Sequence, residues 1–215
     1  ERVLDARMHC LDERLDGLRA MTTLLAQADQ SVVLRSVQAV RSLDDPHTCA
    51  RADSLLAGVR APESAQMARR VGDVRRMHAD IRALQKTGQF KEAIVRARAA
   101  QTLAEATGYR PLQAEALELV GSMESAMGDA LAEHSLKEAA WMAEAERHDE
   151  VAARAMVRLV WVVGFERRQV AASDDLARAA EAALGRIGGH DELSAILRNA
   201  QGAILNKQGK FPEAH

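Results

Sequence analysis

Histidine and cysteine are the residues of this chain most able to do chemistry, and two short stretches place them together. The chain has seven histidines and two cysteines, and the two stretches are His9-Cys10 and His47-Thr48-Cys49. Imidazole and thiolate are the usual ligands of structural zinc. Adjacent residues on a helix point about 100° apart, so neither stretch makes a chelate by itself, and we expect no metal site.

The two cysteines leave two interpretations open. Cys10 and Cys49 are either two small buried side chains or a disulfide pair. A helix that runs away from Cys10 and a second one that returns would bring the two close together, and a bridge there would staple the N-terminal region.

The charged stretch ERHDE at 146–150 contains groups that general acid–base catalysis uses. A solvated turn between helices, with Asp149 capping the next helix, explains the same residues better. No GxSxG, HExxH, GxGxxG or Walker sequence occurs. We therefore predict no catalytic residue, no cofactor and no enzymatic activity in this chain.

The composition indicates a helical protein. Apolar residues make up 47% of the chain but aromatic residues only 3%, and there are four prolines. The apolar content is thus mainly Ala, Leu and Val, and no segment alternates strictly between apolar and polar residues, so we predict an all-α fold.

Charge and hydropathy disfavour two classes of partner. The formal net charge is −2, whereas a domain that binds duplex nucleic acid usually has a basic excess. The most apolar stretch, 155–165, is short and contains Arg158, so we expect no membrane insertion by this chain. A cytoplasmic location and an extracytoplasmic arm of a membrane-anchored parent are both compatible with the sequence.

Two similar segments, TGQFKEA at 87–93 and QGKFPEA at 208–214, indicate an internal repeat. Further copies lie between them, each with a glycine inside a helix followed seven residues later by a small residue at a turn. The pairs are Gly121 with Gly128, Gly164 with Ala171 and Gly202 with Gly209, while Ile81 precedes Gly88 in the first copy. The period of roughly 40 residues predicts stacked pairs of antiparallel helices, because one pair cannot bury its apolar stripe alone.

This pattern resembles the tetratricopeptide repeat (TPR). The stretches 84–100 and 199–214 are closest to its signature, with Gly88, Ala93, Gly202, Gly209 and Ala214 at small positions. The resemblance implies an α-α superhelix over 67–215, made of about four TPR-like hairpins with the last one truncated. The copies depart from the pattern at Glu133, at Ala171 and in a period longer than about 34 residues.

Residues 1–66 do not fit the repeat and are predicted to form an N-terminal helical cap region. We expect helices at 1–28 and 30–43 and a short third one after Asp45-Pro46 that ends near Gly58. The runs MHCLDERLDGLRAMTTLL and VQAVRSL are similar to the region that leads into the repeat arm of large myxobacterial-type serine/threonine kinases. No kinase motif is present. Since both ends appear cut, we expect a piece of a larger regulatory protein.

The first helices of successive units are expected to line a concave groove, and the mid-helix glycine gives the register. The candidate groove residues are Arg75, His78, Arg82, Gln85, Glu115, Glu118, Ser122, Ser125, Arg158, Trp161, Phe165, Arg168, Asn199 and Asn206. Trp161 and Phe165 are either an aromatic anchor for a peptide or packing between units. The two asparagines either bind a peptide backbone or are ordinary exposed residues.

Three functions are therefore open. The first is a non-catalytic protein–protein interaction scaffold that binds a peptide or protein segment in its groove. The second is a sensory or regulatory arm of a serine/threonine kinase that binds a peptide or small ligand. The third is self-association: the truncated last repeat would leave an apolar face open, which predicts a homodimer through residues 193–211.

Overall fold

The computed structural model describes residues 2–50 and 59–209, and over these ranges it contains helices and no strand. The predicted all-α class is therefore confirmed. The helices are α1 (Arg2–Ala26), α2 (Gln30–Arg41), the 3-10 helix η1 (Pro46–Ala50), α4 (Ala65–Lys86), α5 (Phe90–Thr107), α6 (Arg110–Met127), α7 (Ala132–Ala145), α8 (Asp149–Val160), the π-helix η2 (Trp161–Glu166), α9 (Val170–Arg186) and α10 (Asp191–Lys207). The predicted helix end near Gly58 and the repeat residue Ala214 lie outside the described residues.

Local sequence signals set several helix ends. The side chain of Asp29 accepts a hydrogen bond from the backbone N–H of Val32 at the start of α2, and Ser64 does the same for Met67 at the start of α4. These side chains satisfy N–H groups that have no partner within the helix. Asp149 is the first residue of α8, after His148 at the cap position, so its predicted capping role is wrong.

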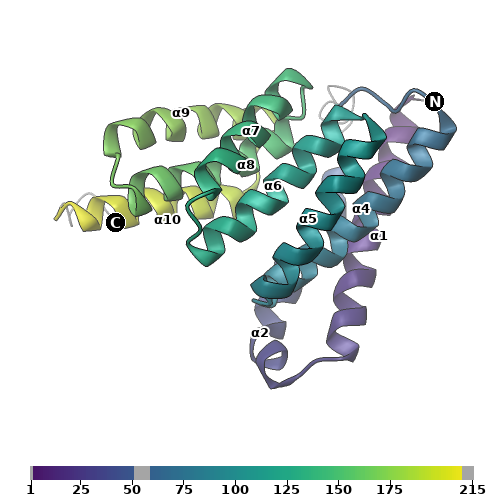
Figure 1. The fold of residues 1–215 in the computed structure, drawn as a ribbon, viewed down its shortest axis with the longest axis horizontal. Helices are drawn as coiled ribbons and strands as arrows, with labels where there is room; N and C mark the ends of the chain where they lie inside the picture. Colours follow the sequence, from purple (N-terminus) through teal and green to yellow (C-terminus); the bar gives the residue numbers. More distant parts are fainter. Residues whose placement is uncertain (1, 51–58, 210–215) are drawn as a thin grey trace.

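Successive helices from α4 onward pack against one another in chain order (Figure 1). Alternate helices also meet, since α4 contacts α6, α6 contacts α8, and α8 contacts α10. The buried apolar residues form separate clusters that pass along this series: one spans α4 to α6, another α7 to η2, and a third α8 to α10. The core is therefore distributed along the series of helices.

The turns show the period most clearly. Residues with positive φ lie at Gly88, Gly108, Gly128, Arg147, Arg168, Gly188, Gly189 and Gly209, so they recur about every 20 residues. Each ends one helix and allows the chain to reverse. In the third copy the left-handed residue is Arg168, and Ala171 lies inside α9. The predicted turn at Ala171 is wrong, because η2 ends at Glu166 and the left-handed residue is Arg168, three residues before the position that Gly164 indicated.

Arg147 and Arg168 are the two non-glycine residues with positive φ among the described residues, at 57° and 60°. A left-handed conformation costs a residue with a Cβ about 1–2 kcal/mol. We expect Arg147→Gly to raise the free energy of unfolding by about 0.5–1 kcal/mol, since glycine also loses more entropy on folding. Urea unfolding measures this, with Arg147→Ala as the control that gains nothing. An Arg147→Ala variant as stable as Arg147→Gly would contradict the prediction.

Two mid-helix glycines mark close helix contacts. A Cβ added at Gly121 would lie 2.7 Å from the Leu136 Cγ and 3.0 Å from its backbone nitrogen in α7. A Cβ at Gly164 would lie 2.3 Å from the Ile204 Cδ1 in α10 and 2.7 Å from the Ser173 Oγ in α9. Both glycines therefore allow neighbouring helices to approach the backbone, as the repeat pattern predicts.

Gly121→Ala is expected to lower the free energy of unfolding by about 2 kcal/mol, because the backbone of α7 must move. Gly72→Ala is the matched control, since its Cβ would meet only the Arg76 guanidinium at 3.8 Å. That substitution should stabilise helix α4 by about 0.5–1 kcal/mol. Denaturant midpoints of the two variants measure both effects, and a Gly121→Ala midpoint equal to that of the wild type would refute the close approach.

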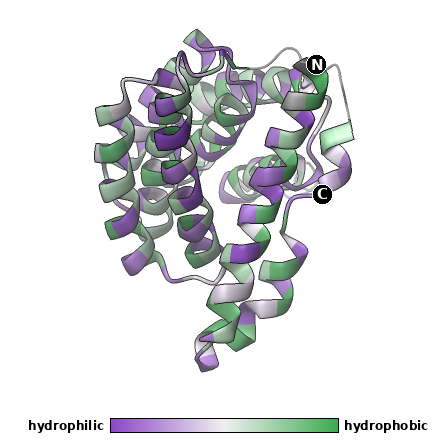
Figure 2. Ribbon diagram, turned by 90° about the vertical axis from the view of Figure 1, so that its right-hand side faces the viewer, coloured by the Kyte–Doolittle hydropathy of each residue, from purple (hydrophilic) through white to green (hydrophobic). Residues whose placement is uncertain are grey.

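The N-terminal region contacts helices along the series and not only the first one. Helix α1 packs along α4 and is joined to α2 by a turn that projects beyond the other helices (Figures 1 and 2). The segment after α2 then returns towards α8 and α10, where Asp44 meets Arg154 and His190. Across residues 2–50 and 59–209, no helix combines the length and hydropathy needed to cross a bilayer.

Candidate functional site

Two adjoining pockets lie where the N-terminal region faces helices α4, α6 and α8. The first, of about 420 Å³, is bounded by α1, residues 43–46, α4, Glu115 of α6 and the first turns of α8. The second, of about 370 Å³, lies between α2 and helices α4, α6, α8 and α10. We call the surface of α4, α6, α8 and α10 that borders these pockets the inner face.

The structure brings most of the predicted groove residues together on the inner face. Arg75, His78, Arg82 and Glu115 line the first pocket, and Arg82, Gln85, Glu118, Ser122 and Arg158 line the second. His78, Glu115, Glu118, Ser122 and Ser125 are buried, whereas an open groove would leave such residues exposed. Arg75 contacts His9 and Glu13 of α1, which shows that the N-terminal region covers this part of the face.

The remaining candidates lie elsewhere. The rings of Trp161 and Phe165 stack with centroids 4.2 Å apart, and both are partly buried against the apolar cluster of α8, α9 and α10. The ammonium of Lys207 lies 4.0 Å from the centroid of the Phe165 ring. This arrangement agrees with the packing alternative for the aromatic pair. Arg168 is in the turn before α9, and Asn199 and Asn206 are exposed on α10 outside both pockets.

A buried ion-pair cluster centred on Glu115 forms the base of the first pocket. Arg75 donates two hydrogen bonds to the Glu115 carboxylate, at 2.7 and 3.2 Å. The His148 Nε2 lies 3.1 Å from Glu115 Oε1, and the His78 Nδ1 lies 3.5 Å from Oε2. Burial alone would raise the pKa of Glu115, but Arg75, His148 and His78 hold it well below its ordinary value. Glu115 is therefore ionised and ties α4, α6 and the start of α8 together.

Two buried side chains of the inner face are not fully paired. Neither ring nitrogen of His78 has a hydrogen-bond partner among the described residues, and the Glu118 Oε2 has none either. The nearest cation to that oxygen is Arg82, at 3.6 Å. Buried polar atoms without a partner are costly, and those in pockets are positions where a ligand or water can bind.

A second ionic cluster joins the N-terminal region to the far end of the inner face. The Asp44 carboxylate accepts a hydrogen bond from Arg14 at 3.0 Å and lies 3.8 Å from the Arg154 guanidinium. Arg154 also pairs with Glu150 at 2.6 Å. Burial would raise the pKa of Asp44, but Arg154 and Arg14 outweigh it and lower the pKa. Asp44 and Arg154 are not among the residues predicted from the sequence, because Asp44 lies outside any periodic pattern.

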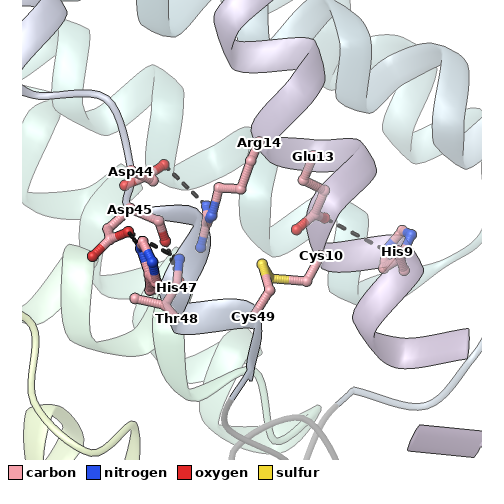
Figure 3. Close-up of a disulfide and its surroundings, with 9 residues drawn as sticks. All are labelled: His9, Cys10, Glu13, Arg14, Asp44, Asp45, His47, Thr48 and Cys49. Atoms are coloured by element: carbon pink, nitrogen blue, oxygen red, sulfur yellow. Dashed lines mark hydrogen bonds and ion pairs between the residues drawn. A yellow bond between two sulfur atoms is a disulfide. The ribbon is translucent and has the colours of Figure 1, made fainter. Parts of the chain in front are cut away.

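A disulfide fixes this segment to α1. Cys10 and Cys49 are bonded, with their Cα atoms 5.7 Å apart (Figure 3). Figure 3 shows the bond beside the Arg14–Asp44 ion pair and the Asp45–His47 pair. The structure thus favours the disulfide alternative for the two cysteines.

The apolar side of α10 is largely covered. Leu193, Leu197, Ala200 and Ile204 are buried against the cluster that α8, η2 and α9 build. Much of the apolar face that motivated a dimer through residues 193–211 is therefore covered, while Ala195 is exposed and Ile196 and Leu205 are half-buried. The dimer itself stays a prediction.

Comparisons of the chain with protein-family models, with curated proteins and with solved structures find no match.

Proposed function

We propose that residues 67–215 form a TPR-like superhelix of antiparallel helix pairs whose inner face binds a segment of another protein. The chain is then a non-catalytic protein–protein interaction scaffold. The observation that carries this proposal is the second pocket, to which α4, α6, α8 and α10 all contribute side chains. The first three contain the predicted groove residues Arg82, Glu118 and Arg158.

The regular spacing of the left-handed turn residues supports the tandem arrangement. Stacked helix pairs offer extended concave surfaces, and proteins of this architecture use such surfaces for binding. Polar and apolar side chains both line the second pocket, among them Leu193 and Ile196 together with Arg82 and Arg158. Such a mixture suits a peptide, whose backbone and side chains need both kinds of contact.

Selection from a displayed random-peptide library tests the proposal. Arg158 suits a counter-selection variant because it lines the second pocket and is only partly buried. We expect peptides that bind the wild-type chain with micromolar affinity and lose at least tenfold on Arg158→Glu, while the convex-surface variant Arg178→Glu binds them unchanged. Peptides that bind wild type and Arg158→Glu equally, or no enriched peptide at all, would refute the proposal.

A further inference from the structure

Residues 42–46, Ser-Leu-Asp-Asp-Pro, lie against the inner face as a bound peptide would. The Lys86 ammonium of α4 donates a hydrogen bond to the carbonyl oxygen of Ser42. Leu43 is partly buried against an apolar cluster made by Ala20 and Met21 of α1, Ala39 of α2 and Ala83 of α4. The segment therefore offers a backbone carbonyl to the inner face, and its apolar side chain packs in a cluster that joins this face to α1 and α2.

Asp44 gives this segment its electrostatic anchor. Its carboxylate lies 3.8 Å from Arg154 of α8 and 3.9 Å from His190 at the start of α10. These contacts come from two helices that are more than 100 residues away in the chain. Arg14 adds a third contact from α1 at 3.0 Å, so one acidic side chain joins three helices.

The inner face has a small excess of positive charge. Its cations are Arg75, Arg82, Lys86, Arg154 and Arg158, against the carboxylates of Glu115, Glu118, Glu150 and Glu192, and Arg35 of α2 adds one more cation to the second pocket. No ion-pair partner of Arg158 is found among the described residues. This excess favours an acidic ligand over a basic or neutral one, both in the encounter and in the complex.

The contacts of Asp44 with the inner face are ones that a competing ligand can replace. The ion pairs of Asp44 with Arg154 and His190 are long and partly exposed, with 24% of the Asp44 side chain accessible. Long, partly solvated ion pairs of this kind contribute little each, whereas the shorter pair with Arg14 and the nearby Cys10–Cys49 disulfide hold the segment to α1 and not to the inner face. Tethering compensates for the weakness, because a segment on the same chain has an effective concentration in the millimolar range.

We infer that residues 42–46 are an internal ligand of the inner face, and that the external partner is an acidic protein segment with an apolar residue before an aspartate, which displaces them. This inference rests on the proposed function and specifies its partner. The first pocket continues beyond Leu43 and Pro46, so a longer external segment has room for contacts that the internal one does not make.

A fluorescein-labelled peptide of residues 40–48, VRSLDDPHT, tests the inference with the full-length oxidised chain. Fluorescence anisotropy gives the Kd for the wild type and for Asp44→Asn, whose internal segment has lost its anchor. We expect a Kd at least tenfold lower for Asp44→Asn. The same peptide with its own Asp44→Asn change is the matched control, and Asp44→Asn/Arg154→Ala should lose the gain.

Leu43→Ala is a second variant that keeps every cation and weakens only the apolar contact, so it should shift the Kd in the same direction if Asp44→Asn does not fold. Equal affinities of the wild type and the folded variants would overturn the inference, as would equal binding of the control peptide. Library peptides that need Arg158 but are not acidic would also overturn it while leaving the proposed function intact. If the library yields no peptide whose binding depends on Arg158, both the proposed function and this inference are refuted.

Discussion

Replacing Glu115 by alanine is expected to lower the free energy of unfolding by about 3–5 kcal/mol. The substitution leaves the buried Arg75 guanidinium without its bidentate partner and removes the acceptor of His148. Removing one member of a buried ion pair is costly because the remaining charge is neither solvated nor neutralised. Urea unfolding followed by circular dichroism measures the loss.

Glu92→Ala is the matched control, because the Glu92–Arg96 pair has a similar distance, 2.6 Å, but both side chains are about half exposed. Its loss should cost no more than about 0.5 kcal/mol. Replacing Arg75 and Glu115 together by methionine should recover most of the stability lost in Glu115→Ala, since no buried charge is then stranded. If Glu115→Ala is no less stable than Glu92→Ala, the claim that the buried ion pairs of Glu115 stabilise the fold is wrong.

Reduction of the Cys10–Cys49 disulfide is expected to lower the free energy of unfolding by about 4 kcal/mol. The bond joins residues 39 apart, and closing a loop of that length removes about this much chain entropy from the unfolded state. Thermal unfolding with and without reductant measures the change. The double variant Cys10→Ser/Cys49→Ser should be as stable as the reduced wild type, and reductant should not change its stability.

Mass spectrometry gives an independent check on the bond. Both thiols should resist alkylation in the native chain and in unfolded chain that has not been reduced. Alkylation of Cys10 and Cys49 in unfolded, unreduced chain would show that they are free, and the expected effect of reductant would vanish.

Helix positions were largely predictable from the sequence. Gly88, Gly128 and Gly209 end helices in the left-handed conformation, as their place in the repeat indicated. Glycine is easily recognised at such turns because it takes positive φ without strain. The turn at Arg168 was missed, since an arginine in the left-handed conformation carries no sequence signal.

The candidate site was predictable only in part. Helical register grouped Arg82, Glu118 and Arg158, and the structure places all three in the lining of the second pocket. Register cannot place Asp44, which lies in an irregular segment after α2 and reaches Arg154 only through the tertiary fold. The burial of His78 beneath the N-terminal region was missed for the same reason.

The distance between α2 and the helix array tests the central claim, that the inner face binds an acidic segment in place of residues 42–46. Spin labels at Leu34 of α2, 81% exposed, and at Arg178 of α9 leave both pockets untouched. The account predicts one narrow distance distribution for the oxidised chain alone, and a shifted or broadened one with saturating acidic peptide. A distribution unchanged by bound peptide would contradict it.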